Sequence, residues 1–259
     1  MLGYGHVCVD PPPDTMVADI PVRHNYSAHS SDIVQVTVHG IIDRMNYATS
    51  LAPTGAVPLV DILNWGPASL GHYKVSGRGP FEGAANLQFS AQDQPRNSLT
   101  YGLTDLDYFF HATGFASDVN HWDTSSVTSM DSTFKSTSMT GAEIAHWDTS
   151  SVTSLKEAFG YAAAFNHDLS AWDTRSVRSL SNAFRNSGLA KGVGAWDTSS
   201  VDNIDQAFYQ AKSFNEDLGG WDTSRFTQLH QIFVQDDVYQ GLGLQHWDVS
   251  SKSTQNMNT

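Results

Sequence analysis

Residues 122–130 read Trp-Asp-Thr-Ser-Ser-Val-Thr-Ser-Met, and near copies of this stretch recur to the end of the chain. Successive Trp-Asp pairs are separated by 25, 25, 24, 25 and 26 residues. The pairs are Trp122 and Asp123, Trp147 and Asp148, Trp172 and Asp173, Trp196 and Asp197, Trp221 and Asp222, and Trp247 and Asp248. We number each position by its distance from the Trp of its unit. A period of this length predicts a repeat protein, in which each unit packs only on its neighbours.

Four further apolar positions keep register with the Trp, at −3, +5, +8 and +12. Position +12 is occupied by Phe134, Phe159, Phe184, Phe208 and Phe233. Five apolar columns in register predict a solenoid whose coils share one interior. At a strand spacing of about 4.8 Å, five coils span about 25 Å. We expect brief strands in the Ser-Val-Thr-Ser-Leu segments and one or two helical turns in Ala-Phe segments such as 156–159.

The Asp at +1 has an explanation that needs no ligand. An Asp-Thr-Ser sequence folds its side chains onto nearby backbone N–H groups in Asx or Ser/Thr turns. Such a turn satisfies the backbone at a corner where an unpaired N–H is costly. The alternative is calcium bound between stacked carboxylates, and we favour the turn.

The repeat fades towards the N-terminus. Leu103, Leu106 and Phe110 keep the +5, +8 and +12 spacing, although Ser98 replaces the Trp, and residues 81–87 resemble another corner. We therefore assign 81–259 to the solenoid. Residues 31–80 carry two strand-like apolar runs, 33–41 and 59–65, and form a predicted β-rich cap that closes the first coil. Residues 1–30 form an irregular arm.

Composition excludes several classes of partner. The chain of 259 residues has 27 Asp and Glu against 14 Lys and Arg, a formal net charge of −13. This charge disfavours nucleic acid and anionic membrane surfaces as partners, and no apolar run predicts membrane insertion. Cys8 is the single cysteine, so no internal disulfide forms. Residues 1–8 lack the basic and apolar regions of a signal peptide.

The Trp-Asp-Thr-Ser-x-Val-x-x-Met repeat of residues 122–130 resembles the BspA-like, leucine-rich-repeat-related surface proteins, which share the lipoprotein-associated repeat of mycoplasma surface proteins. Residues 61–66, 81–87 and 90–95 resemble the entry region of that family. The resemblance extends over 33–259 and implies an α/β, LRR-like solenoid with adhesion or recognition at a cell surface or outside the cell. It transfers no catalytic or ligand-reading residue.

Other chemistry finds little support in the sequence. His121, His146 and His246 each precede a Trp and suggest a metal pair between coils, but the other coils have Ala or Gly there. No G-x-S-x-G, Walker or dinucleotide motif is present. Regular rows of Thr on a flat solenoid face can bind ice, and the Thr residues at +2 and +6 begin such rows. Arg178 and Asp202 interrupt the row at +6, which argues against ice binding. Stacked Trp residues suggest a glycan ladder, yet their core-like spacing favours burial. We predict no catalytic residue, cofactor or metal site.

The last coil is unfinished, because the apolar columns stop after Trp247 and residues 252–259 are polar. An open edge invites pairing, so we hypothesise self-association or docking through this coil. We expect a non-catalytic protein that binds a protein or glycan through its repeat surface. The alternative is a structural subunit of a larger assembly.

Overall fold

The computed structural model describes most of the chain from residue 103 onwards and short segments before it. The described residues are 80–81, 87–89, 94, 103–114, 118–139, 144–227, 229–235 and 238–250, with the backbone of 41–42, 60–62 and 69–70. The predicted arm, most of the predicted cap and the polar tail lie outside these residues.

Four short strands precede the regular repeats. They are β1 (Ile41–Ile42), β2 (Val60–Ile62), β3 (Ser69–Leu70) and β4 (Leu87–Phe89). Two parallel pairs form, β1 with β3 and β2 with β4. Val60 pairs with Leu87, slightly more than one repeat length later, so the chain returns to the same edge after one circuit. This second pair joins the predicted cap to the predicted solenoid across residue 80.

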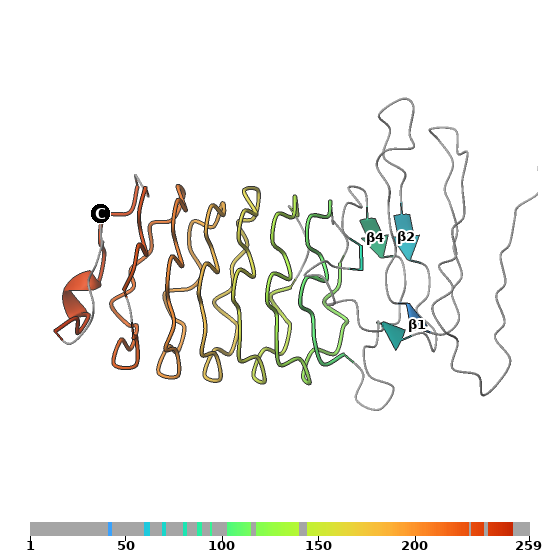
Figure 1. Cartoon of the computed structure of the whole chain (residues 1–259), viewed down its shortest axis with the longest axis horizontal. Helices are drawn as coiled ribbons and strands as arrows, with labels where there is room; N and C mark the ends of the chain where they lie inside the picture. The colour runs from blue at the N-terminus through green and yellow to red at the C-terminus, as the bar shows by residue number, and fades with distance from the viewer. Residues whose placement is uncertain are drawn as a thin grey trace, which may run out of the picture.

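From residue 103 onwards the chain winds through stacked coils, seen side by side along the long axis in Figure 1. We call coils 1 to 5 the units that begin at Trp122, Trp147, Trp172, Trp196 and Trp221. Parallel bridges link successive coils at position +7, as between Ser129 and Ser154. In the described coils these are single-residue bridges, where we expected brief strands. The 3-10 helix η3 (Leu244–His246) closes coil 5.

The Ala-Phe segments form consecutive β-turns, where we expected helical turns. Two positions in each coil, +10 and +14, have positive φ, as at Ser132 (56°) and Ser136 (58°) in coil 1. A residue in the left-handed region at the third position of a β-turn is typical of type II turns. It also interrupts a right-handed helix. The same geometry recurs in coils 2 to 5 and in the preceding coil at Tyr108 and Ala112.

Hydrogen bonds between coils explain why the turns replace a helix. The N–H groups at +10, +12 and +14 point to the following coil, as when Ser132 donates to the Lys156 carbonyl and Phe134 to the Ala158 carbonyl, both at 2.8 Å. The alternate N–H groups close the turns, as when Thr133 donates to the Met130 carbonyl at 3.2 Å. Each alternate peptide therefore serves stacking, which a continuous helix does not allow.

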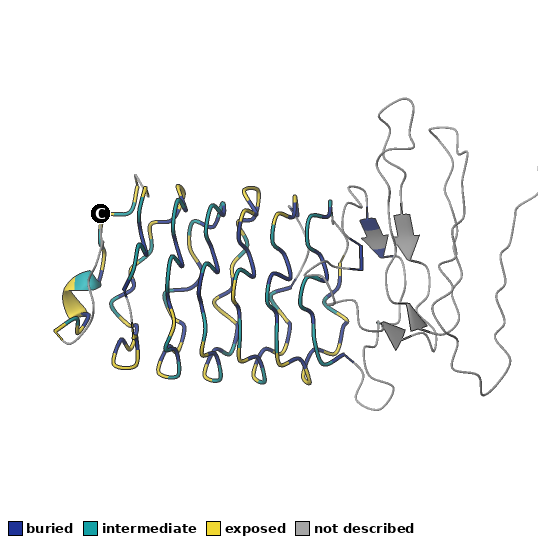
Figure 2. Cartoon of the chain, viewed as in Figure 1, coloured by how far each residue is buried: buried dark blue, intermediate teal, exposed yellow. Residues whose placement is uncertain are grey.

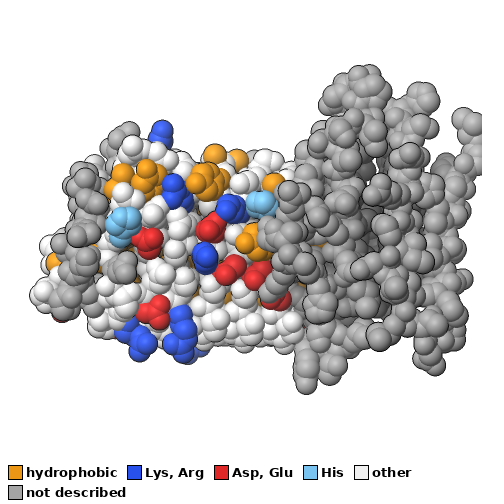
Figure 3. Space-filling model, in the orientation of Figure 1, with side chains coloured by type: hydrophobic (Ala, Val, Ile, Leu, Met, Phe, Trp, Pro, Cys, Tyr) orange, Lys and Arg blue, Asp and Glu red, His pale blue; other side chains and the backbone are white. Residues whose placement is uncertain are grey.

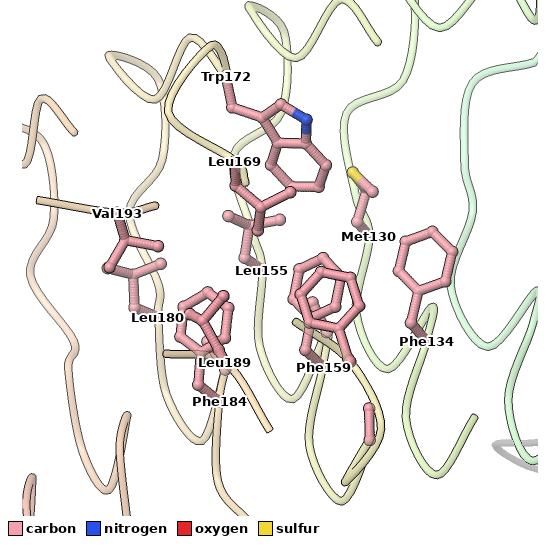
Figure 4. Close-up of a cluster of buried hydrophobic side chains, with 14 of the residues drawn as sticks. Met130, Phe134, Leu155, Phe159, Leu169, Trp172, Leu180, Phe184, Leu189 and Val193 are labelled. Carbon is pink, nitrogen blue, oxygen red and sulfur yellow. The ribbon is translucent and has the colours of Figure 1, made fainter. Parts of the chain in front are cut away.

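The interior is a stack of like side chains. Figure 2 shows buried residues in each of the stacked coils, and Figure 4 shows Phe and Leu side chains of successive coils lying in rows. Adjacent +12 rings lie nearly parallel, with centroid distances of 5.2 Å for Phe134–Phe159 and 5.5 Å for Phe159–Phe184. Offset aromatic pairs contribute about 0.5–1.5 kcal/mol beyond their buried area. The column therefore favours like residues at matching positions.

The left-handed positions give a first prediction. Ser136 is exposed and has a φ of 58°, so Ser136→Gly is expected to raise the free energy of unfolding by about 0.5–1 kcal/mol. Ser136→Val is expected to lower it by about 1 kcal/mol, because a β-branched side chain tolerates positive φ poorly. Urea unfolding measures both. Ser138→Gly is the matched control, since Ser138 is also exposed but lies outside the left-handed region, and there glycine should destabilise. Equal loss at both serines would contradict the prediction.

Candidate recognition surface

The predicted Trp residues lie at buried corners and bind the preceding coil. Each is 3–6% exposed. From Trp147 onwards, each indole N–H donates at 3.0 Å to the carbonyl at −3 of the coil before, as from Trp147 to Val119 and from Trp172 to Ile144. The remaining pairs are Trp196 to Leu169, Trp221 to Val193 and Trp247 to Leu218. The Trp rings are therefore part of the core and do not present faces to a glycan.

The predicted Asp residues lie beside these corners, and each accepts hydrogen bonds within its own turn. The Asp148 carboxylate accepts from the Ser150 backbone N–H at 3.0 Å and from its hydroxyl at 2.6 Å. The pairs Asp123–Ser125, Asp197–Ser199, Asp222–Ser224 and Asp248–Ser250 repeat the backbone bond at 2.8–3.1 Å. Asp173 accepts from Arg175 instead. This geometry accounts for every Asp at +1 without a cation.

These bonds lower the pKa of the carboxyl groups. Hydrogen bonds from the Ser hydroxyl, the largest cause, and then from the Ser N–H lower the pKa of Asp148, Asp197 and Asp222. A hydrogen bond from the Arg175 side chain lowers the pKa of Asp173. A carboxyl whose folded pKa is depressed stabilises the fold above its unfolded pKa, and this contribution is lost as pH falls through the folded pKa.

A pH prediction follows for Asp148. Asp148→Asn should lower the free energy of unfolding at pH 6, because the amide accepts the Ser150 bonds without a charge. The difference from wild type should shrink towards zero as pH falls below the unfolded Asp pKa of about 3.9, where the wild-type carboxyl is protonated in the unfolded chain and then in the folded one. Urea midpoints between pH 3 and pH 6 measure this. A difference in stability that is independent of pH would count against stabilisation of the turn by an ionised Asp148 carboxylate.

The Thr at +2 has a role that sequence analysis missed. Thr124 is 2% exposed, and its hydroxyl donates at 3.0 Å to the Asp148 carbonyl of the next coil. Thr149, Thr174 and Thr198 repeat this bond. Thr128 at +6 is exposed, so the two Thr columns do not share one face. The constancy of Thr at +2 beside the variable +6 was the available signal.

The His residues before the Trp, which suggested a metal pair, are surface side chains in the described part of the chain. His121, His146 and His246 are exposed beside their corners. Across the described segments, no group of three or more His, Cys, Asp or Glu side chains is close enough to hold a metal ion. The histidines at 24, 29 and 39 lie outside the described residues.

A row of cations and tyrosines, which was not predicted, runs along the surface formed by the β-turns at +10 to +14. We call this surface the turn face. Lys135, Tyr161, Arg185 and Tyr209 come from coils 1, 2, 3 and 4, and we call them the cation–tyrosine row. The Lys135 ammonium lies 5.9 Å from the Tyr161 ring centroid, and the Arg185 guanidinium carbon lies 5.8 Å from it. The same Arg185 carbon lies 4.4 Å from the Tyr209 ring centroid. Each neighbouring pair falls within the range of a cation–π interaction.

The turn geometry places this row on the surface. Its members occupy positions +13 and +14, at the end of the β-turn run where the residue at +14 has positive φ, 60° at Tyr161. Tyr161 is 46% exposed, and the other three members are partly buried. In the orientation of Figure 3, basic, acidic and hydrophobic side chains lie close together over the coils.

Amide side chains fix the central guanidinium. Arg185 donates through Nη1 to Asn182 Oδ1 at 3.2 Å and also to Gln206 Oε1. Lys135 pairs with Glu157. The row is therefore held by contacts between neighbouring coils before any partner binds, which lowers the entropy cost of binding.

Sequence analysis missed this surface because its residues differ from coil to coil. A cation at +13, a tyrosine at +14, a cation at +13 and a tyrosine at +13 occupy four successive coils. The available signal was this alternation, which becomes visible only when the units are aligned by their Trp.

The geometry defines a class: a repeat protein of stacked coils with buried Trp corners and a variable turn face. The model of one family, described as Mycoplasma protein of unknown function, DUF285, matches residues 104–189 and again 178–259. The chain belongs to this family. The second match begins three repeat units after the first, as from Trp122 to Trp196. Comparison with curated proteins and with solved structures gave no match.

The family match bears on part of the resemblance described above. It supports a Mycoplasma repeat family. The BspA-like and leucine-rich-repeat assignments stay proposals. No helix that could cross a bilayer occurs among the described segments.

Proposed function

We propose that this chain is a non-catalytic recognition protein, an LRR-like solenoid of the BspA-like kind, whose cation–tyrosine row binds a protein partner at a cell or particle surface. The observation that supports it is the row itself. Tyr and Arg are enriched among the residues that dominate protein–protein binding energy. Tyr161 and Arg185 lie adjacent on one face, and Arg185 is also held by Gln206 of the following coil.

A protein partner fits this row better than a glycan does. A sugar ring stacks on an open aromatic face. Lys135 and Arg185 come from the coils before and after Tyr161, and both lie over its ring. Arg185 also lies over the Tyr209 ring. The tyrosines therefore offer ring edges and hydroxyl groups, which suit hydrogen bonds and side-chain packing at a protein interface.

The Asp residues at +1 form an acidic column, and the turn geometry that repeats from coil to coil supports a structural role for them. The Asp carboxylates at +1 are already engaged by their own turns, as in Asp148 with Ser150. We assign them no catalytic or cation-binding role. The surface location in the proposal comes from the family resemblance.

A structural subunit is the second candidate, because apolar side chains are exposed on coil 5. Val238 is 42% exposed and Leu242 is 41% exposed. Exposed apolar side chains suit packing against another component of an assembly.

The experiment is affinity capture from native extract with the tagged full-length chain and two variants. Tyr161→Ala with Arg185→Gln removes the centre of the row, and Arg178→Gln alters an exposed cation at +6. We expect one or a few partners that wild type and the Arg178→Gln control retain, and that the row variant binds about 30-fold or more weakly.

Other outcomes separate the candidates. A stoichiometric set of proteins captured equally by all three forms would favour the structural subunit. Glycoconjugates that bind after the protein part is removed by protease would argue against a protein partner. Capture that is lost in EDTA would revive calcium at the Asp column.

A further inference from the structure

Arg185 differs from the other paired cations of the described coils because its partners are neutral. Lys135 pairs with Glu157 and Arg175 with Asp173. Arg185 makes its hydrogen bonds to the amide oxygens of Asn182 and Gln206, and no carboxylate of the described residues lies within ion-pair distance of it. Partial burial of a charge without a counter-charge costs free energy, and a carboxylate bound at Arg185 would offset part of this cost.

The orientation of this guanidinium is fixed while part of it stays unused. Nη1 makes both amide bonds, and the guanidinium carbon lies 4.4 Å from the Tyr209 ring centroid. Nε is buried without a hydrogen-bond partner. Nη2 makes no hydrogen bond to the described residues. An arginine has five N–H donors in a planar fork that matches a carboxylate. Because Nε is buried, Nη2 is the donor of Arg185 that suits one carboxylate oxygen.

The local positive charge at Arg185 favours an acidic ligand there. The chain as a whole carries −13, which repels acidic partners at long range. The row concentrates Lys135 and Arg185 along one line, with Glu157 beside Lys135. An acidic group therefore finds its complement locally at Arg185, and the edges of Tyr161 and Tyr209 flank that place for apolar contact.

We propose that Arg185 anchors a carboxylate of the partner, from an Asp or Glu in a peptide segment that also packs an apolar side chain against Tyr161. This inference rests on the proposed function, because it names the chemistry that the cation–tyrosine row recognises. It assigns Arg185 the specificity and Tyr161 the apolar contact.

The test selects a random twelve-residue phage-displayed peptide library on the full-length chain, with counter-selection on Arg185→Gln. We expect the enriched peptides to share an Asp or Glu at a fixed position. In a synthetic peptide, its replacement by Asn or Gln should weaken binding to wild type about tenfold to a hundredfold. The same replacement should have no effect on binding to Arg185→Gln.

Each outcome separates the two levels of the proposal. Peptides that need Tyr161 but are indifferent to the acid-to-amide change would overturn the carboxylate and leave the recognition surface standing. If every peptide enriched on wild type is removed by the counter-selection on Arg185→Gln and also binds Tyr161→Ala, or if no peptide is enriched at all, both are overturned. Sialyllactose, an acidic sugar, is the comparison probe, and its binding through Arg185 without any peptide binding would overturn the protein partner. Unchanged thermal unfolding of Arg185→Gln verifies that the variant is folded.

Discussion

Trp172→Ala is expected to lower the free energy of unfolding by about 3–5 kcal/mol. Trp172 lies in the middle of the stack, with its ring centroid 5.8 Å from that of Phe159 and 6.4 Å from that of Trp196. The substitution empties this space and removes the indole N–H that donates to the buried Ile144 carbonyl at 3.0 Å. The carbonyl keeps its other donor, the Trp147 backbone N–H at 3.2 Å, so loss of the indole hydrogen bond adds about 0.5–1.5 kcal/mol to the packing loss.

Trp247→Ala is the comparison, because the stack makes position matter. Trp247 occupies the same repeat position and donates the same bond, to the Leu218 carbonyl. It begins the partial unit that follows coil 5, so its loss disturbs one coil interface while Trp172 serves two. In a linear array of units the central change should therefore cost more and split urea unfolding into two transitions. Equal losses at both positions, or a single sharp transition for Trp172→Ala, would contradict this account.

Trp172→Phe separates packing from hydrogen bonding. Phenylalanine keeps an aromatic ring between Phe159 and Trp196 but has no N–H for the Ile144 carbonyl. Its loss of stability should fall between wild type and Trp172→Ala. The fluorescence of the remaining tryptophans reports unfolding in each variant.

The core was predictable from sequence because the same side-chain types recur at the same positions. Phe134, Phe159 and Phe184 appear at +12 in successive units, and each is buried in the shared interior. The Asp turn was predictable for a similar reason. It closes over two residues, so local sequence contains all of its hydrogen-bonding groups.

The turn conformation was not predictable because no residue type marks it. Positions +10 and +14 hold Ser132, Glu157, Tyr161, Asn186 and Gln206 among others, none of them glycine. Their positive φ follows from hydrogen bonds to the next coil, which outweigh the local preference for a helix. The helix propensity of a segment does not include its hydrogen bonds to the coil one repeat away.

The recognition surface escaped prediction because it depends on the stack. Lys135 and Arg185 are fifty residues apart in sequence, and both reach Tyr161 because their coils flank its own. Variation at +13 and +14 is tolerated because these side chains do not fill the interior. This freedom lets one face differ from coil to coil while the corners stay constant.

Gly188→Ala is expected to lower the free energy of unfolding by about 3 kcal/mol, although it adds a single methyl group. A Cβ at Gly188 would lie 2.3 Å from the Ala163 carbonyl oxygen and 3.0 Å from the Phe165 carbonyl oxygen, both in the preceding coil. These are backbone atoms, so the contact is relieved only if coils 2 and 3 separate. Separation would weaken the bond from the Gly188 N–H to the Ala162 carbonyl, now 3.1 Å.

Gly220→Ala is the matched control for this effect. A Cβ at Gly220 meets only the Gly194 carbonyl oxygen at 3.7 Å, an ordinary contact. The equivalent position holds Ala171 and Ala195 in other coils. Gly220→Ala should therefore stay within about 0.5 kcal/mol of wild type or be slightly more stable, because alanine restricts the unfolded chain. Urea unfolding of the two variants measures the difference. If Gly188→Ala is as stable as Gly220→Ala, coils 2 and 3 do not approach as closely as 2.3 Å implies, and the coil spacing that places Tyr161 between Lys135 and Arg185 would fail with it.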